Sequence, residues 1–134
     1  MDLIKRNDYM KILIIEDDKI LSRTVEQCLK GRYEIDAAYD GGEGLLYAKQ
    51  EIYDLIILDI MMPVMDGYQA LVGIRNMEKE RNIPDEKAVK VIMATALNDE
   101  KNVKMAFELG CTIYSGKPID QERFEEALKR LDLI

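Results

Sequence analysis

The sequence contains no histidine among its 134 residues and only two cysteines, Cys28 and Cys111. The lack of histidine excludes Ser–His–Asp and Cys–His catalytic pairs, histidine metal ligands and a phosphorylated histidine. Two thiols alone cannot supply the four protein ligands of a structural zinc site. Nothing else in the sequence suggests secretion, so we expect two reduced thiols rather than a disulfide.

Basic charge and long apolar runs are also scarce. The chain has 19 Lys and Arg against 26 Asp and Glu, which gives a net charge of −7. Such an acidic chain is poorly suited to bind nucleic acid through its overall field. No run approaches the roughly 18 apolar residues of a membrane span, and the first ten residues contain no signal-peptide-like apolar stretch. We therefore expect a cytoplasmic protein without a nucleic-acid or membrane partner.

Length and composition indicate one ordinary globular domain. Hydrophobic residues make up 48% of the chain and charged residues 34%, unlike a disordered segment. There is no internal repeat and no low-complexity linker. We expect residues 1–10 to form an N-terminal extension and residues 11–134 to form the domain.

Short apolar runs alternate with amphipathic segments along the chain. The runs predict strands at 11–15, 34–38, 54–58, 89–95 and 112–115. Each is followed by a predicted helix, with Asn98-Asp99 and Asp120 as helix starts and Gly31 and Gly110 as stops. The residues expected to face the sheet are Leu21, Val25, Cys28, Leu29, Leu45, Ala48, Ile52, Leu71, Ile74, Met77, Val103, Ala106, Phe107, Phe124, Leu128 and Leu131. Five such repeats, with right-handed crossovers, predict a three-layer, doubly wound α/β domain with a five-stranded parallel sheet.

Polar residues stand where the predicted strands end. Glu16, Asp17 and Asp18 follow the first strand, Asp59 follows the third, Thr95 ends the fourth, and Lys117 follows the fifth. Each alone has an ordinary structural explanation, and for Asp18 a helix cap is the better interpretation. Ligands in such sheets bind outside the carboxyl ends of the strands, so together these residues predict one site.

The predicted site has the composition of a phosphoryl-transfer centre. Clustered carboxylates repel one another, and Mg²⁺ relieves the repulsion while keeping positions for phosphate oxygens. A carboxylate beside the metal can attack phosphorus. The Lys117 ammonium and the Thr95 hydroxyl would then contact two other phosphoryl oxygens.

The sequence resembles the receiver domains of bacterial two-component response regulators. The resemblance runs from residue 11 to about 131 and is carried by ILIIEDD (12–18), LIILDIMMPVMDG (55–67), VIMATA (91–96) and YSGKP (114–118). It implies a flavodoxin-like sheet with strand order 2-1-3-4-5.

The resemblance also implies roles for individual residues. Asp59 would be the phospho-acceptor. Asp17 would be a direct Mg²⁺ ligand, Glu16 a partner acting through water, and the backbone carbonyl of Met61 a further ligand.

A second group of residues would contact the phosphoryl group or respond to it. Thr95 would be the switch hydroxyl, and Lys117 the counter-ion. Tyr114 would be a switch aromatic, with a half-buried strand tyrosine as an equal alternative. Pro118 would follow a cis peptide bond.

The expected function is that of a signalling phospho-acceptor rather than an enzyme, beyond assisting its own phosphorylation and dephosphorylation. The chain ends after the fifth predicted helix, so we expect a stand-alone receiver. A histidine kinase or phosphotransfer protein would phosphorylate Asp59. The face made by the fourth helix, fifth strand and fifth helix would then bind or release an unidentified downstream protein. Met61 and Leu97 cannot orient a water, which predicts slow self-hydrolysis.

Three alternatives stay open. A phosphorelay shuttle would use the same residues to pass the group to another histidine. A pseudo-receiver would bind partners without phosphorylation. A flavin- or nucleotide-binding protein of similar topology is disfavoured, because its phosphate loop would be the acidic segment 16–18.

Overall fold

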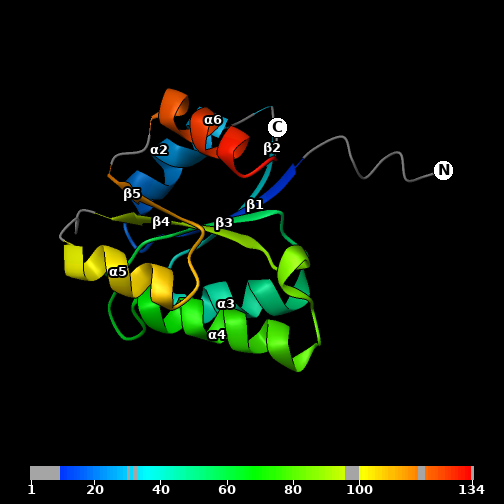
Figure 1. Ribbon diagram of the computed structural model, residues 1–134. Coiled ribbons are helices and arrows are strands. Elements are labelled where there is room, and N and C mark those ends of the chain that lie inside the picture. Colours follow the sequence, from blue (N-terminus) through cyan, green and yellow to red (C-terminus); the bar gives the residue numbers. More distant parts are fainter. Residues whose placement is uncertain (1–9, 30, 32, 96–99, 118–119, 134) are drawn as a thin grey trace.

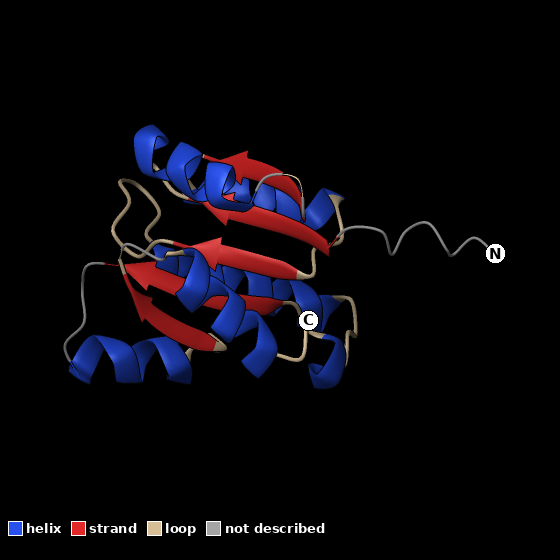
Figure 2. Ribbon diagram, turned by 90° about the horizontal axis from the view of Figure 1, so that it is seen from above, coloured by secondary structure: helices blue, strands red, loops and turns tan. Residues whose placement is uncertain are grey.

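The computed structural model describes residues 10–133 except 30, 32, 96–99 and 118–119. Its strands form one parallel five-stranded sheet in the order β2-β1-β3-β4-β5 (Figures 1 and 2). The predicted strand order and doubly wound α/β class are thereby confirmed. The strands are β1 (Met10–Ile15), β2 (Tyr33–Ala38), β3 (Leu55–Leu58), β4 (Lys90–Thr95) and β5 (Ile113–Gly116).

The helices cover both faces of the sheet, with α2 and α6 on one side and α3, α4 and α5 on the other (Figure 1). Their bounds are α2 (Lys19–Leu29), α3 (Gly41–Gln50), α4 (Gly67–Glu80), α5 (Glu100–Glu108) and α6 (Gln121–Arg130), with a short 3₁₀ helix η1 (Asp85–Lys87) before β4. Within the described part of the chain, no helix is both long and apolar enough to span a bilayer.

Two apolar cores explain why the strands are almost continuously hydrophobic. Successive strand residues point to opposite faces, and helices bury both faces. In β1, Leu13 and Ile15 pack into the core under α3 and α4, whereas Ile12 and Ile14 pack into the core under α2 and α6. Packing on both sides fixes the strand register, and with it the strand ends that carry the polar residues.

Most predicted inward-facing residues are buried or half-buried, but three are wrong. Cys28 is exposed, because the buried face of α2 runs through Ser22 and Leu29. Ile52 is 88% exposed, because α3 ends at Gln50 and the chain continues in an extended conformation. Phe107 is 49% exposed, because α5 contacts the core through the neighbouring Ala106. The predicted cap Asn98-Asp99 lies outside the described residues.

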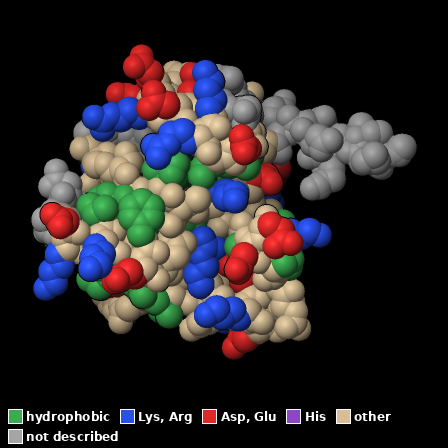
Figure 3. Space-filling model, viewed as in Figure 1, with side chains coloured by type: hydrophobic (Ala, Val, Ile, Leu, Met, Phe, Trp, Pro, Cys, Tyr) green, Lys and Arg blue, Asp and Glu red, His purple; other side chains and the backbone are tan. Residues whose placement is uncertain are grey.

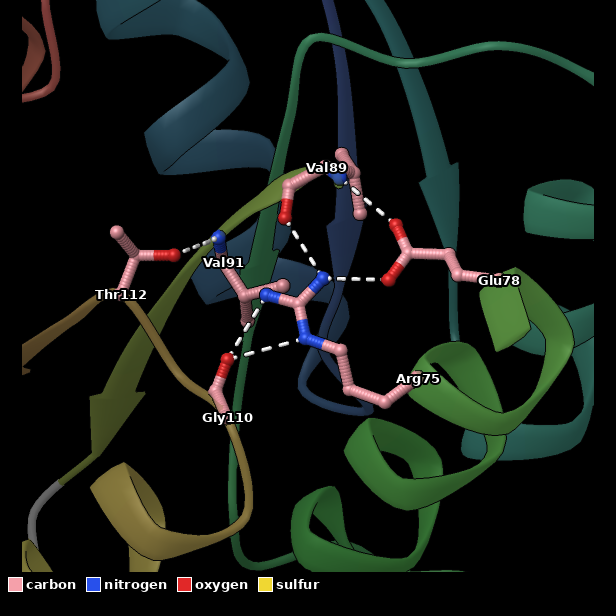
Figure 4. Close-up of polar contacts among 6 residues, drawn as sticks. All are labelled: Arg75, Glu78, Val89, Val91, Gly110 and Thr112. Atoms are coloured by element: carbon pink, nitrogen blue, oxygen red, sulfur yellow. Dashed lines mark hydrogen bonds and ion pairs between the residues drawn. The ribbon is translucent and has the colours of Figure 1, made fainter. Parts of the chain in front are cut away.

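Arg75 of α4 links three elements at the amino end of the sheet (Figure 4). Its Nη1 donates to the carbonyl oxygen of Val89 (2.9 Å) and to Glu78 Oε1 (2.8 Å), and Nη2 and Nε donate to the carbonyl oxygen of Gly110 (2.8 and 3.1 Å). Glu78 is 6% exposed and accepts the Val89 N–H at 2.7 Å. This pair therefore holds α4 against the start of β4 and against the turn that follows α5.

Candidate functional site

Three carboxylates meet at the carboxyl end of the sheet. Glu16 and Asp17 directly follow β1, and Asp59 directly follows β3. Because Ile15 pairs with Leu58 in the register, Glu16 and Asp59 leave adjacent strand ends side by side. Glu16, Asp17 and Asp59 each offer an oxygen, and these atoms lie within 4.8 Å of one another. Asp17 is exposed, whereas Glu16 and Asp59 are only 6% and 5% exposed.

Lys117 directly follows β5, the edge strand beyond β4, and its side chain reaches into this cluster. Its Nζ lies 2.5 Å from Glu16 Oε1 and 3.2 Å from Asp59 Oδ1. Its backbone N–H donates to the carbonyl oxygen of Thr95 at 3.0 Å, which ties the segment after β5 to the end of β4. Burial lowers the pKa of Lys117, but the hydrogen bond to Glu16 and the charge of Asp59 outweigh it and raise the pKa. Lys117 is therefore a cation at neutral pH.

The cluster carries more negative charge than Lys117 can balance. Burial raises the pKa of Glu16 above its ordinary value, although the hydrogen bond from Lys117 lowers it. Burial likewise raises the pKa of Asp59 against the charge of Lys117, and the charge of Asp17 raises it further. Ionising both buried carboxyls is therefore costly without a further cation.

Asp18 has the capping role that its sequence position favours. Its Oδ1 accepts the N–H groups of Ile20 (2.9 Å) and Leu21 (3.2 Å), in the first turn of α2. Its own N–H donates to Glu16 Oε2 at 3.1 Å. The start of α2 thus orients Glu16.

Of the remaining predicted residues, Met61 and Thr95 lie close to the cluster. A hollow of about 240 Å³ is lined by Glu16, Asp17, Asp18, Leu21, Asp59, Met61, Thr95 and Lys117. Thr95 is fully buried, and a backbone hydrogen bond from Met61 to the Asp59 carboxylate lowers the pKa of Asp59. Tyr114 is half-buried and pairs with Met93, two residues before Thr95. Tyr114 does not line the hollow, and Pro118 lies outside the described residues.

Gly67 has no role among the residues predicted from the sequence, yet its backbone packs against that of Asp59. A Cβ atom built on Gly67 would lie 2.2 Å from the Asp59 carbonyl oxygen. The available signal was the recurrence of Asp-Gly at 40–41 and 66–67, each pair opening a helix.

The chain matches the family model described as "Response regulator receiver domain" over residues 12–129. "Regulatory protein VanRB" of Enterococcus faecalis is 35% identical over 126 residues, which cover 93% of this chain and 52% of that protein. The chain spans about half the length of the curated relatives it matches.

Two solved structures resemble the chain over nearly its full length. The receiver domain of the Pseudomonas aeruginosa sensor histidine kinase PA1611, solved with a magnesium ion coordinated in its active site cleft, is 28% identical. The TM-score is 0.78, with 91% of this chain and 96% of that chain covered. The co-crystal of the Saccharomyces cerevisiae phosphotransfer protein Ypd1 with the Ssk1 receiver domain matches at 25% identity. Its TM-score is 0.82, with 91% of this chain and 88% of that chain covered.

The family match, the parallel sheet with its terminal acidic cluster, and these structural relatives agree. The chain belongs to the response regulator receiver domain family of two-component and phosphorelay signalling.

Proposed function

We propose that this domain accepts a phosphoryl group on Asp59 from a phosphohistidine of a histidine kinase or phosphotransfer protein, in a reaction that needs Mg²⁺. The observation that carries the proposal is the position of Asp59. Its carboxylate is almost fully buried, yet lines an open hollow beside two further carboxylates and the Lys117 ammonium.

The residues around Asp59 fit a magnesium ion. Three carboxylates offer oxygen atoms within 4.8 Å of one another, and Mg²⁺ prefers oxygen ligands. Asp17, Asp59 and the Met61 carbonyl would hold the ion, and Glu16 would contact it through water. When bound, Mg²⁺ supplies positive charge that keeps the buried carboxylates ionised and offsets the charge of an incoming phosphoryl group.

Asp59 acts as the nucleophile in the proposed transfer. One of its carboxylate oxygens attacks phosphorus, an O–P bond forms, and the N–P bond of the donor breaks. The bond electrons return to the ring nitrogen, and the donor leaves as neutral imidazole when its other nitrogen carries a proton. Lys117, now 3.2 Å from Asp59 Oδ1, would pair with a phosphoryl oxygen, and Thr95 would donate its hydroxyl to another.

Exposed apolar side chains near the hollow favour a protein as the phosphoryl donor. Ile20 is 75% exposed beside Leu21, which lines the hollow, and Met61 and Val64 are 61% and 103% exposed in the segment after Asp59. Exposed apolar side chains that gather around one site, rather than lying scattered singly, are typical of a protein-binding surface. The Ypd1–Ssk1 co-crystal supports a phosphotransfer protein as the kind of partner.

We place the proposed output on α5, β5 and α6. Ala106 is the one buried residue of α5, so few apolar contacts hold this helix to the sheet. Hydrophobic side chains gather over the region of α5 and β5 (Figure 3). A shift of Thr95 toward the phosphoryl group would reach this face through Tyr114 and change its affinity for a downstream protein.

Intact mass measurement tests the acceptor role directly. The protein is incubated with acetyl phosphate, with and without Mg²⁺, beside an Asp59→Ala control. We expect one added phosphoryl group in the wild type with Mg²⁺, and none in the control or without the metal. A folded wild-type protein that binds Mg²⁺ but is phosphorylated neither by acetyl phosphate nor by a phosphorylated phosphotransfer protein would overturn the proposal in favour of a pseudo-receiver.

A further inference from the structure

We propose that Gly41 and Gly67 are positioning residues for the metal site. They position the segment 60–66, here called the acceptor loop. In this position the Met61 backbone and the Asp59 carboxylate both face the proposed Mg²⁺ position. This inference rests on the proposed function, because it concerns the ligands that would hold Mg²⁺.

Gly67 lets the first turn of α4 touch the backbone of the acceptor residue. A Cβ atom at Gly67 would lie 2.2 Å from the Asp59 carbonyl oxygen, 2.9 Å from the Asp59 carbonyl carbon and 2.7 Å from Ile60 Cα. All three are backbone atoms, so no side-chain rotation relieves the overlap. Any larger residue must move either α4 or the end of β3.

Hydrogen bonds close the acceptor loop at the same place. The carbonyl oxygen of Ile60 accepts the N–H of Gly67 at 2.8 Å and that of Met62 at 3.1 Å. Met61 lies between these bonds, and its backbone is also hydrogen-bonded to the Asp59 carboxylate. The direction of the Met61 carbonyl therefore depends on how closely Gly67 approaches Ile60.

Gly41 supports the other side of the acceptor loop. A Cβ atom there would lie 2.8 Å from Met65 Cγ and 2.9 Å from the Met65 carbonyl oxygen. Gly41 opens α3 and Gly67 opens α4, each preceded by an aspartate whose side chain caps the helix. Two helix starts thus hold the loop from two directions.

Glycine is required at positions 41 and 67 because a Cβ atom has no room there, not because the backbone has a positive φ angle. Among the described glycines, the positive φ angles belong to Gly31 and Gly110. The strained backbone lies instead within the loop, where Val64 has a φ of 68° and Met65 N–H donates to the Pro63 carbonyl oxygen at 2.8 Å. A branched residue keeps such a conformation only where its surroundings fix it.

Calorimetric titration with MgCl₂, on protein shown by circular dichroism to be folded, tests the proposal. We expect Gly67→Ala to weaken Mg²⁺ binding by about 10- to 100-fold, as displacement of supporting residues does at other metal sites. Gly41→Ala should cause a smaller loss, because its first contact is the flexible Met65 side chain. The acetyl phosphate reaction of Gly67→Ala should stay slow at saturating Mg²⁺, because the substitution also displaces Asp59.

Two other glycines provide matched controls. An added Cβ at Gly42 meets only Asp40 Oδ1, at 3.4 Å, so Gly42→Ala should bind Mg²⁺ like the wild type. An added Cβ at Gly73 meets the Leu45 side chain at 2.8 Å, away from the loop. Gly73→Ala should therefore lower stability while leaving Mg²⁺ affinity unchanged.

The outcomes separate this inference from the proposed function. A folded Gly67→Ala protein with wild-type Mg²⁺ affinity would overturn the inference and leave the proposed function standing. If Gly67→Ala does not fold, Gly41→Ala decides, and wild-type affinity there overturns the inference. A wild-type protein that binds no Mg²⁺ would overturn both.

Discussion

The Lys117 ammonium lies 2.5 Å from Oε1 of Glu16, a residue 101 positions earlier in the chain. It lies farther from Asp59, at 3.2 Å. Lys117 is thus paired mainly with Glu16 while remaining within reach of Asp59. In the proposed phosphorylated state, the new negative charge at Asp59 would draw Lys117 away from Glu16, so the same ammonium serves both states.

We expect Asp59→Asn to stabilise the metal-free protein at pH 7, by about 1 kcal/mol. The pKa of Asp59 is raised in the folded protein, chiefly by burial. A carboxyl group whose pKa is higher in the folded than in the unfolded state costs stability as it ionises. The wild type should therefore lose stability as the pH rises from the unfolded-state pKa of Asp59 through its folded-state pKa. Denaturant unfolding at several pH values measures the effect, and Asp59→Asn should flatten this part of the profile.

Magnesium supplies the control for this prediction. Mg²⁺ should raise the free energy of unfolding of the wild type by mass action and have a much smaller effect on Asp59→Asn. If Asp59→Asn is less stable than the wild type at neutral pH without Mg²⁺, burial of the ionised carboxylate is not the dominant cost.

Replacing Lys117 by methionine should destabilise the metal-free protein by about 2–3 kcal/mol, because buried carboxylates lose their cation. Mg²⁺ should then stabilise Lys117→Met more than it stabilises the wild type, since the ion meets uncompensated charge. Thermal unfolding with and without Mg²⁺ gives both values. Equal Mg²⁺ effects on the two proteins would contradict the electrostatic coupling.

Arg75→Met should cost about 3–4 kcal/mol, because it leaves Glu78 as a buried, uncompensated charge and removes two donors from the Gly110 carbonyl. Arg75→Lys should not restore stability, since an ammonium cannot reproduce the guanidinium fork. The matched control is Arg81→Met. Arg81 is exposed and donates to the Lys49 carbonyl, so its loss should cost under about 1 kcal/mol. Urea unfolding of the three variants decides the comparison.

The fold could be predicted because apolar periodicity reports burial on both faces of the sheet. The errors occur where a side chain hydrogen-bonds a backbone group of the predicted strand, or where a neighbouring residue occupies the buried face of a helix. Val89 was predicted as a strand residue, but its N–H donates to Glu78 and β4 begins at Lys90. Phe107 has the expected helical spacing, yet it is exposed because the short helix α5 buries only the neighbouring Ala106.

The acidic cluster could be predicted because strand ends converge at one edge of a parallel sheet. What sequence spacing could not reveal is which pairs touch. The preference of Lys117 for Glu16 over Asp59 depends on side-chain reach across the sheet. The overlap of Gly67 with Asp59 depends on how the acceptor loop folds back on itself, so only packing reveals it.

The two thiols should differ strongly in reactivity. Cys28 is exposed, whereas Cys111 is 7% exposed and burial raises the pKa of its thiol to about 11. At mildly alkaline pH, iodoacetamide should modify Cys28 and leave Cys111 intact, because the thiolate is the reactive form. Mass spectrometry should find one label in the native protein and two in urea. Rapid labelling of native Cys28→Ser would contradict the burial of Cys111.

The phosphoryl group proposed to form on Asp59 should be lost slowly, because the Met61 side chain that lines the hollow has no group that orients an attacking water. Met61→Asn should speed hydrolysis by about tenfold, since an amide can position a water near phosphorus. Its Mg²⁺ affinity should stay unchanged, because the proposed ligand is the backbone carbonyl. Val64→Asn is the matched control, since Val64 is exposed in the same loop but does not line the hollow. Loss of the added mass after removal of acetyl phosphate gives the rate. Fast loss in the wild type, or equal acceleration by both variants, would show that the Met61 side chain does not set the lifetime.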